Sequence, residues 1–184
     1  MILVWRGLFG SALLCLLLGA LPGCAGFMPA TADRSDSLSG RLSVRIGGTP
    51  ERGLNAGFEL VGTPVEGRLL LSGPLGTTAA QARWSGGQAW LASAGVETAY
   101  VDLDALIAAA LGERIPMTAL FDWLRGRPWA GAPAAARGDG LPGFEQLGWQ
   151  VQLARWAEGW VEAYRPASLT RPEVTVRVRL EPAA

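Results

Sequence analysis

Histidine and lysine are absent from this chain of 184 residues, and cysteine occurs only twice, at Cys15 and Cys24. Without histidine, the chain cannot assemble the Ser–His or Cys–His pair of a nucleophilic enzyme, or an ordinary zinc site. Its 16 basic residues, all arginines, balance 16 acidic ones, and they form no basic stripe of the kind that binds nucleic acid. We therefore expect no enzymatic activity, no metal or other cofactor, and no nucleic-acid partner.

The first 23 residues have the features of a secretory signal peptide. An arginine near the start precedes the apolar run 8–21, which is shorter than the roughly 20 residues of a membrane-spanning helix. The segment Leu21-Pro-Gly-Cys24 resembles the cleavage box of bacterial lipoproteins, in which the cysteine is acylated and becomes the mature N-terminus. We predict a lipoprotein signal peptide over residues 1–23 and lipidation of Cys24; a cleaved signal with an incidental cysteine is the alternative.

The position of the other cysteine, Cys15, supports the prediction of a lipid anchor at Cys24. Cys15 lies inside the apolar run and would be removed with it, so the mature chain cannot form an internal disulfide. The residues after Cys24 are Ala25 and Gly26, which favour the outer membrane over retention in the inner one. Residues 24–37 are small, polar and proline-bearing, and we expect them to be a tether.

The rest of the chain, residues 38–184, has the length of one domain. Apolar and polar residues alternate along many short segments, which is typical of half-buried antiparallel strands. Glycine- and proline-rich turns separate these segments. The expected strands cover 40–46, 54–61, 69–71, 77–84, 88–93, 149–153, 160–165 and 174–180, with Tyr100 closing the first half and a loop over 126–143.

Two amphipathic helices are expected between the two groups of strands. Asp102 is a plausible N-cap for a helix over 103–111, and Gly112 a C-cap. Pro116 opens a second helix, which Gly126 ends. Because each helix must bury an apolar face, the pattern predicts an α+β fold: a curved antiparallel sheet whose inner face the helices cover.

The inner face is broad and the helices are short, so the pattern allows either a solid core or an apolar cavity. Alternation places five strand residues inward, beneath the helix that carries Leu120 and Leu124. They are Leu42, Val44, Leu69, Leu71 and Val151.

The turn between the expected strands 69–71 and 77–84 carries an unusual residue. Pro74 and the flanking Gly73 and Gly76 favour a tight turn, which places Leu75 at its tip. A leucine exposed to water forgoes roughly 1.5–3 kcal/mol of burial energy. Leu75 therefore either folds back onto its own hairpin or meets something other than water.

Several motifs, in this order along the chain, resemble the LolB family of outer-membrane lipoprotein receptors. They are Gly40-Arg-Leu-Ser-Val-Arg45, Leu71-Ser-Gly-Pro-Leu-Gly76, Tyr100, Ile115-Pro116 with Leu120, Trp123-Leu-Arg-Gly-Arg-Pro128 and Gly148-Trp-Gln-Val151. The resemblance implies a half-open β-barrel with a lid of short helices around an apolar cavity that holds acyl chains.

The resemblance also implies a function. Such a protein would accept acylated lipoproteins from the periplasmic carrier LolA and insert them into the outer membrane. It would be a lipid-anchored monomer facing the periplasm, with outer-membrane lipids as a further partner. Pro74, Leu75 and Gly76 match the membrane-insertion loop of the family. The alternative is another lipid-binding or envelope-assembly lipoprotein of similar fold.

The lipid anchor makes a first testable prediction. The variant Cys24→Ala should be recovered as a folded, soluble periplasmic protein, because it lacks the predicted acyl anchor. Fractionation of cells expressing the variant or the wild type measures this. Recovery of Cys24→Ala in washed outer membranes at the wild-type level would contradict the assignment.

Overall fold

The computed structural model describes residues 37–48 and 53–182. The predicted signal peptide 1–23, the lipidation site Cys24 and all of the tether 24–37 except its last residue lie outside these residues. In the described ranges, no helix is both long and apolar enough to cross a membrane.

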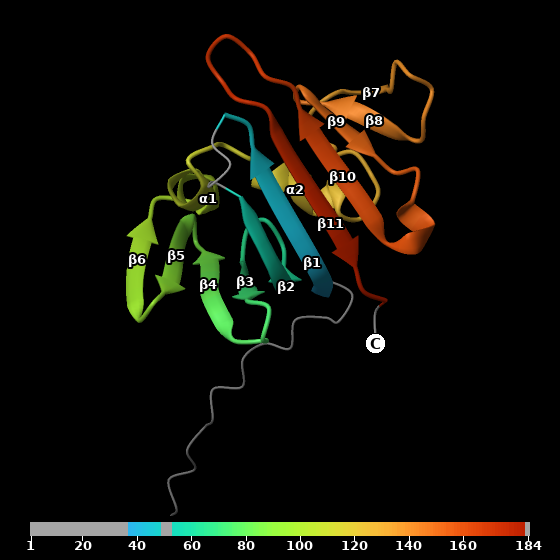
Figure 1. Ribbon diagram of the computed structural model, residues 1–184. Helices are drawn as coiled ribbons and strands as arrows, with labels where there is room; N and C mark the ends of the chain where they lie inside the picture. Colours follow the sequence, from blue (N-terminus) through green and yellow to red (C-terminus); the bar gives the residue numbers. More distant parts are fainter. Residues whose placement is uncertain (1–36, 49–52, 183–184) are drawn as a thin grey trace, which may run out of the picture. The chain divides into compact units, whose positions relative to one another are not determined.

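Eleven strands form one antiparallel sheet in the described part of the chain, in the order β6-β5-β4-β3-β2-β1-β11-β10-β9-β8-β7 (Figure 1). The sheet does not close on itself, since β6 and β7 are its two edges. The strands are β1 (Ser37–Ile46), β2 (Leu54–Gly62), β3 (Gly67–Ser72), β4 (Thr78–Ser85), β5 (Gln88–Ser93), β6 (Val96–Tyr100), β7 (Ala134–Ala136), β8 (Gly143–Gln146), β9 (Trp149–Gln152), β10 (Trp160–Arg165) and β11 (Val174–Leu180).

The pairing of β1 with β11 joins the N-terminal and C-terminal groups of strands. It runs over seven residue pairs, from Gly40 opposite Leu180 to Ile46 opposite Val174. At its start the chain needs a glycine, because Gly40 has φ +152° and a Cβ there would lie 2.0 Å from the carbonyl oxygen of Arg179. The close approach of β1 to β11 therefore depends on the absence of a side chain at residue 40.

Two helices follow the first six strands: α1 (Leu103–Leu111) and α2 (Met117–Trp123). The predicted caps of α1 are confirmed. The carboxylate of Asp102 accepts a hydrogen bond from the Ala105 N–H at 2.6 Å, and Gly112, at φ 72°, donates its N–H to the Ala108 carbonyl at 2.9 Å. Asp104 also has a structural role, since its carboxylate accepts a hydrogen bond from the Met117 N–H at 3.2 Å.

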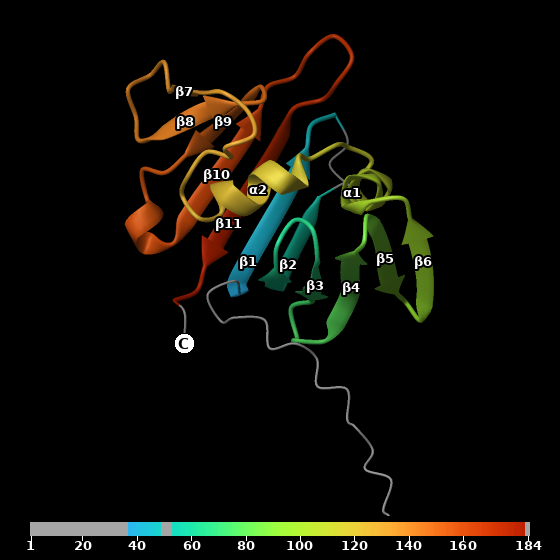
Figure 2. The same ribbon diagram turned by 180° about the vertical axis from the view of Figure 1, so that it is seen from behind.

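Both helices lie on one face of the sheet, and Figure 2 shows α2 crossing in front of β11 and β1. Aromatic residues pack between α2 and the sheet, on the side of β8 to β10 and at β4. The Trp123 ring lies 5.9 Å from that of Trp149, and Trp123 is completely buried. Phe121 meets Trp84 of β4 edge to face, with ring centroids 5.9 Å apart. The predicted α+β fold, an open curved sheet covered by helices, is confirmed.

The prediction of a loop over 126–143 was wrong in part. Residues Ala134–Ala136 form the edge strand β7, which pairs with β8. All three alanines are exposed, so no alternation of apolar and polar residues marks this strand in the sequence. Strand β8 begins at Gly143 and was not predicted. The helix α2 begins one residue after Pro116 and ends at Trp123, three residues before Gly126.

Candidate functional site

An apolar cavity of about 120 Å³ lies between the helices and the inner face of the sheet. Every residue that lines it is apolar. The sheet side comes from β1 to β5 and β11, where alternate residues point inward. Six of the seven residues predicted to line a cavity are among them: Leu42, Val44, Leu69, Leu71, Leu120 and Leu124.

Helix α1 contributes lining residues that the sequence analysis did not assign to the cavity. They are Leu106, Ile107, Ala110 and Leu111. Their helical spacing in the sequence predicts that they share one apolar face of the helix. The sequence does not show that this face lies above the cavity. Ile107 and Leu111 are half-buried, as are Leu42, Leu69 and Leu71, so part of the cavity lining is in contact with solvent.

Val151 does not line this cavity. It is completely buried in β9, where it pairs with Ala163 of β10 and Phe144 of β8. Because β10 separates β9 from β11, Val151 lies in the part of the sheet where Trp123 and Trp149 pack. Alternation gave its inward direction correctly, but the strand order decides which part of the inner face it occupies.

The charged groups with shifted pKa values lie away from the cavity. A hydrogen bond from Arg137 lowers the pKa of the exposed Asp139, and one from Arg155 lowers that of the exposed Glu158. Since no titratable residue is among those lining the cavity, its chemistry suits an uncharged, apolar ligand.

The turn between β3 and β4 exposes Leu75 to solvent. The Gly76 N–H donates to the Gly73 carbonyl at 3.0 Å, and the Gly73 N–H donates to the Thr77 carbonyl at 2.9 Å. Gly76 has φ 75°, a conformation that favours glycine. Leu75 is 91% exposed, so the alternative that it folds back onto its own hairpin is wrong.

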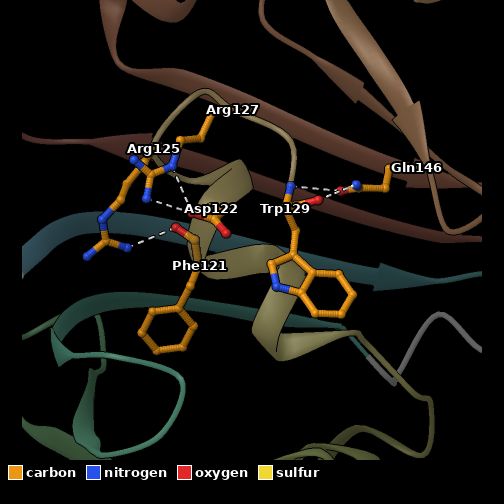
Figure 3. Close-up of polar contacts among 6 residues, drawn as sticks. All are labelled: Phe121, Asp122, Arg125, Arg127, Trp129 and Gln146. Atoms are coloured by element: carbon orange, nitrogen blue, oxygen red, sulfur yellow. Dashed lines mark hydrogen bonds and ion pairs between the residues drawn. The ribbon is translucent and has the colours of Figure 1, made fainter. Parts of the chain in front are cut away.

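The segment after α2 is held by one buried amide. The side-chain oxygen of Gln146 accepts hydrogen bonds from the indole N–H of Trp123 at 2.8 Å and from the backbone N–H of Trp129 at 2.9 Å (Figure 3 shows Trp129 and Gln146). Its nitrogen donates to the carbonyls of Trp129 and Ala132, at 2.7 and 2.8 Å. All four hydrogen-bonding positions of the amide are therefore used.

The two arginines after α2 serve the same segment. Arg127 pairs with Asp122 at 2.8 Å, and Arg125 donates to the carbonyl of Phe121 at 2.8 Å (Figure 3). The link between the helices is fixed as well, because the nearly buried Arg165 of β10 pairs with Glu113 at 2.8 Å. These contacts hold the two ends of α2, whereas α1 is attached by apolar packing and by the hydrogen bond from the Met117 N–H to Asp104.

The Gln146 network makes a stability prediction. In Gln146→Leu, the N–H groups of Trp123 and Trp129 and two carbonyls lose their partners, at about 1–3 kcal/mol for each group left buried and unpaired. We expect the free energy of unfolding to fall by at least about 3 kcal/mol, measured by urea denaturation. The matched control is Gln150→Leu, at a half-buried position of β9, which should cost less than about 1 kcal/mol. Equal losses in the two variants would contradict this role.

Comparison with known proteins gives relatives over most of the chain. The family described as "Outer membrane lipoprotein LolB" matches residues 36–181. A protein of Bordetella petrii named "Outer-membrane lipoprotein LolB" is 35% identical over 79% of this chain and 77% of its own length.

Two further relatives carry the same name. The protein of Chromobacterium violaceum is 30% identical over 86% of this chain and 89% of its own. That of Cupriavidus necator is 32% identical over 93% of this chain and 95% of its own. The matched residues include the lining residues of the cavity and the turn with Leu75. The resemblance noted in the sequence is thus confirmed, and the chain belongs to the LolB family of outer-membrane lipoproteins.

Proposed function

We propose that this protein accepts acylated lipoproteins from a LolA-type periplasmic carrier and inserts them into the outer membrane. The observation that carries the proposal is the pairing, in one domain, of a wholly apolar cavity with a turn that exposes Leu75. The cavity would receive the acyl chains, and the turn would enter the bilayer during their release. Cys24 would anchor the protein in the same membrane, facing the periplasm.

The transfer needs no nucleotide on physical grounds. Each methylene moved from water into an apolar environment gains about 0.8 kcal/mol. Acyl chains therefore pass readily between apolar sites when they avoid water on the way. A cavity lined by leucine, valine, isoleucine, methionine, phenylalanine and alanine side chains offers such a site.

The cavity must enlarge to hold its cargo. Its volume of about 120 Å³ lies well below the roughly 300–1,000 Å³ of ordinary ligand pockets. Helix α1 is the element that moves in this proposal, because its inner face meets the sheet through apolar side chains such as Leu106 and Ile107. Its C-terminal end stays attached through Glu113 and Arg165.

The acceptance of cargo is tested by placing a charged side chain in the cavity. In Leu71→Glu, a carboxylate faces a site whose lining offers no partner, which is costly for an apolar cargo and for the site itself. We expect transfer of acylated cargo from the carrier to this variant to be abolished. Cargo bound after mixing with loaded carrier is measured by native mass spectrometry.

The matched control is Leu70→Glu, one residue earlier on β3 and on the opposite face of the sheet. It should accept cargo as the wild type does. Circular dichroism establishes that both variants are folded. Normal acceptance by a folded Leu71→Glu protein would show that the cavity is not the cargo site.

The release step is tested at the turn. Leu75→Glu should change the free energy of unfolding by no more than about 0.5 kcal/mol, because the side chain is 91% exposed. The variant should still take cargo from the carrier, since the cavity is unchanged. It should fail to deliver that cargo to liposomes, because a carboxylate replaces the apolar side chain that enters the bilayer.

The control for this step is Leu169→Glu, which charges another fully exposed leucine, in the loop between β10 and β11. That loop lies at the opposite end of the sheet from the β3–β4 turn (Figure 1). Delivery is measured as cargo in floated liposomes. If Leu75→Glu delivers cargo as fast as Leu169→Glu and the wild type, Leu75 has no part in insertion.

A further inference from the structure

A row of residues crosses the outer face of the sheet and ends at the turn that carries Leu75. The register pairs Trp160 with Arg179, Arg179 with Arg41, Arg41 with Gly57, and Gly57 with Ser72. With neighbouring strands about 4.8 Å apart, the row spans about 19 Å. Along its own strand, each residue of the row is next to a residue that points inward. Because successive side chains of a strand point to opposite faces, the row lies on the face opposite the cavity.

The row lies in a surface groove of about 860 Å³, which Pro74 and Gly76 of the turn also line. Several of the residues that line the groove are small, among them Gly57 and Ser72. Gly57 has no side chain, and a Cβ there would lie 2.5 Å from the hydroxyl oxygen of Ser72. Between Arg41 and the turn, the row therefore carries only the small side chain of Ser72, which lies over Gly57.

The groove is electropositive, with four arginines and two glutamates among the residues that line it. Arg41 lies directly opposite Arg179, and like charges in that position destabilise an antiparallel pair. Arg177 is neutralised by Glu162. In the described part of the chain, no ion pair joins Arg41 or Arg179 to the lining glutamates, Glu59 and Glu181.

We propose that Arg41 and Arg179 bind the phosphate of an anionic lipid headgroup in the bilayer that Leu75 enters. An anion between the two guanidinium groups would offset their mutual repulsion and accept hydrogen bonds from both. This inference rests on the proposed function of the turn. It adds a lipid-recognition site that sets which membrane the turn enters and how the outer face lies against it.

The neighbours of the arginines favour a membrane over an acidic protein. The Trp160 ring lies 5.8 Å from the Arg179 guanidinium, and its side chain is half-buried. Tryptophan, arginine and an exposed leucine within one surface are typical of a membrane interface, where apolar groups enter the bilayer and cations meet the headgroups.

The experiment follows the position of the turn in the protein as isolated from membranes and reconstituted in vesicles. A fluorophore sensitive to polarity is attached at Thr77→Cys, an exposed position beside the turn. The vesicles are phosphatidylcholine alone, or phosphatidylcholine and phosphatidylglycerol in equal parts. The test variant is Arg41→Gln with Arg179→Gln. Its matched control is Arg114→Gln with Arg171→Gln, which removes the same charge from exposed arginines outside the groove.

On the mixed vesicles, the test variant should lower the ratio of inserted to free turn by about thirtyfold, since a basic residue near an anionic surface contributes about 1 kcal/mol. The control pair should insert as the wild type does, and high salt should reduce the difference. The melting temperature of the test variant should equal or exceed that of the wild type, because a like-charge pair is removed.

Three results would overturn the inference. One is unchanged insertion of the test variant into mixed vesicles. Another is a loss of equal size in vesicles of phosphatidylcholine alone. The third is impaired uptake of cargo from the carrier without a loss of insertion that depends on phosphatidylglycerol, which would assign the groove to a protein. None of these affects the turn itself, whose role fails only if Leu75→Glu delivers cargo normally.

Discussion

The antiparallel pairing of β1 with β11 is the constraint on which the rest of the structure depends. It joins strands from the two ends of the domain into one sheet, and each contributes to the same wall of the cavity: Leu42 and Val44 from β1, and Val176 and Val178 from β11. Without this pairing, β1 to β6 and β7 to β11 would be two separate sheets, each with an additional unpaired edge. The absence of a Cβ at Gly40 is what lets the two strands approach where the pairing begins.

The inner face of that sheet is filled unevenly. On the side of β8 to β10, the indoles of Trp123 and Trp149 occupy the space beneath α2, and Gln146 satisfies the Trp123 N–H. On the side of β1 to β5, α1 presents leucine, isoleucine and alanine, which leave about 120 Å³ empty. Large aromatic groups fill a gap between a helix and a sheet better than alanines do. The cavity thus lies where α1 and part of α2 face the sheet with aliphatic side chains.

The sequence was sufficient for most elements and for their inward residues. Where period two or a clear cap was present, the predicted bounds of β5, β10, β11 and α1 agree with the structure, because local chemistry decides them. Strand β7 was missed because its three alanines have no pattern and pairing with β8 alone makes it a strand. Val151 was wrongly predicted to line the cavity, since alternation gives the direction of a side chain but not the order of the strands in the sheet. The row from Trp160 to Ser72 was likewise invisible, because it joins five strands whose register only the folded sheet fixes.

Strand β3 and its turn connect the two faces. Leu71 points into the cavity, Ser72 points into the outer groove, and Leu75 lies three residues further on at the tip. A slip of one residue in the register of β3 would exchange the two faces, placing Ser72 among the leucines and Leu71 in the groove. The register of β3 against β4 shifts between Leu71 and Ser72, where the pairing gives way to the glycine-bounded turn. This short segment thus places an apolar cavity, a cationic surface and an exposed leucine within a few residues of one another. In the proposed function, cargo that leaves the cavity is therefore released next to the turn.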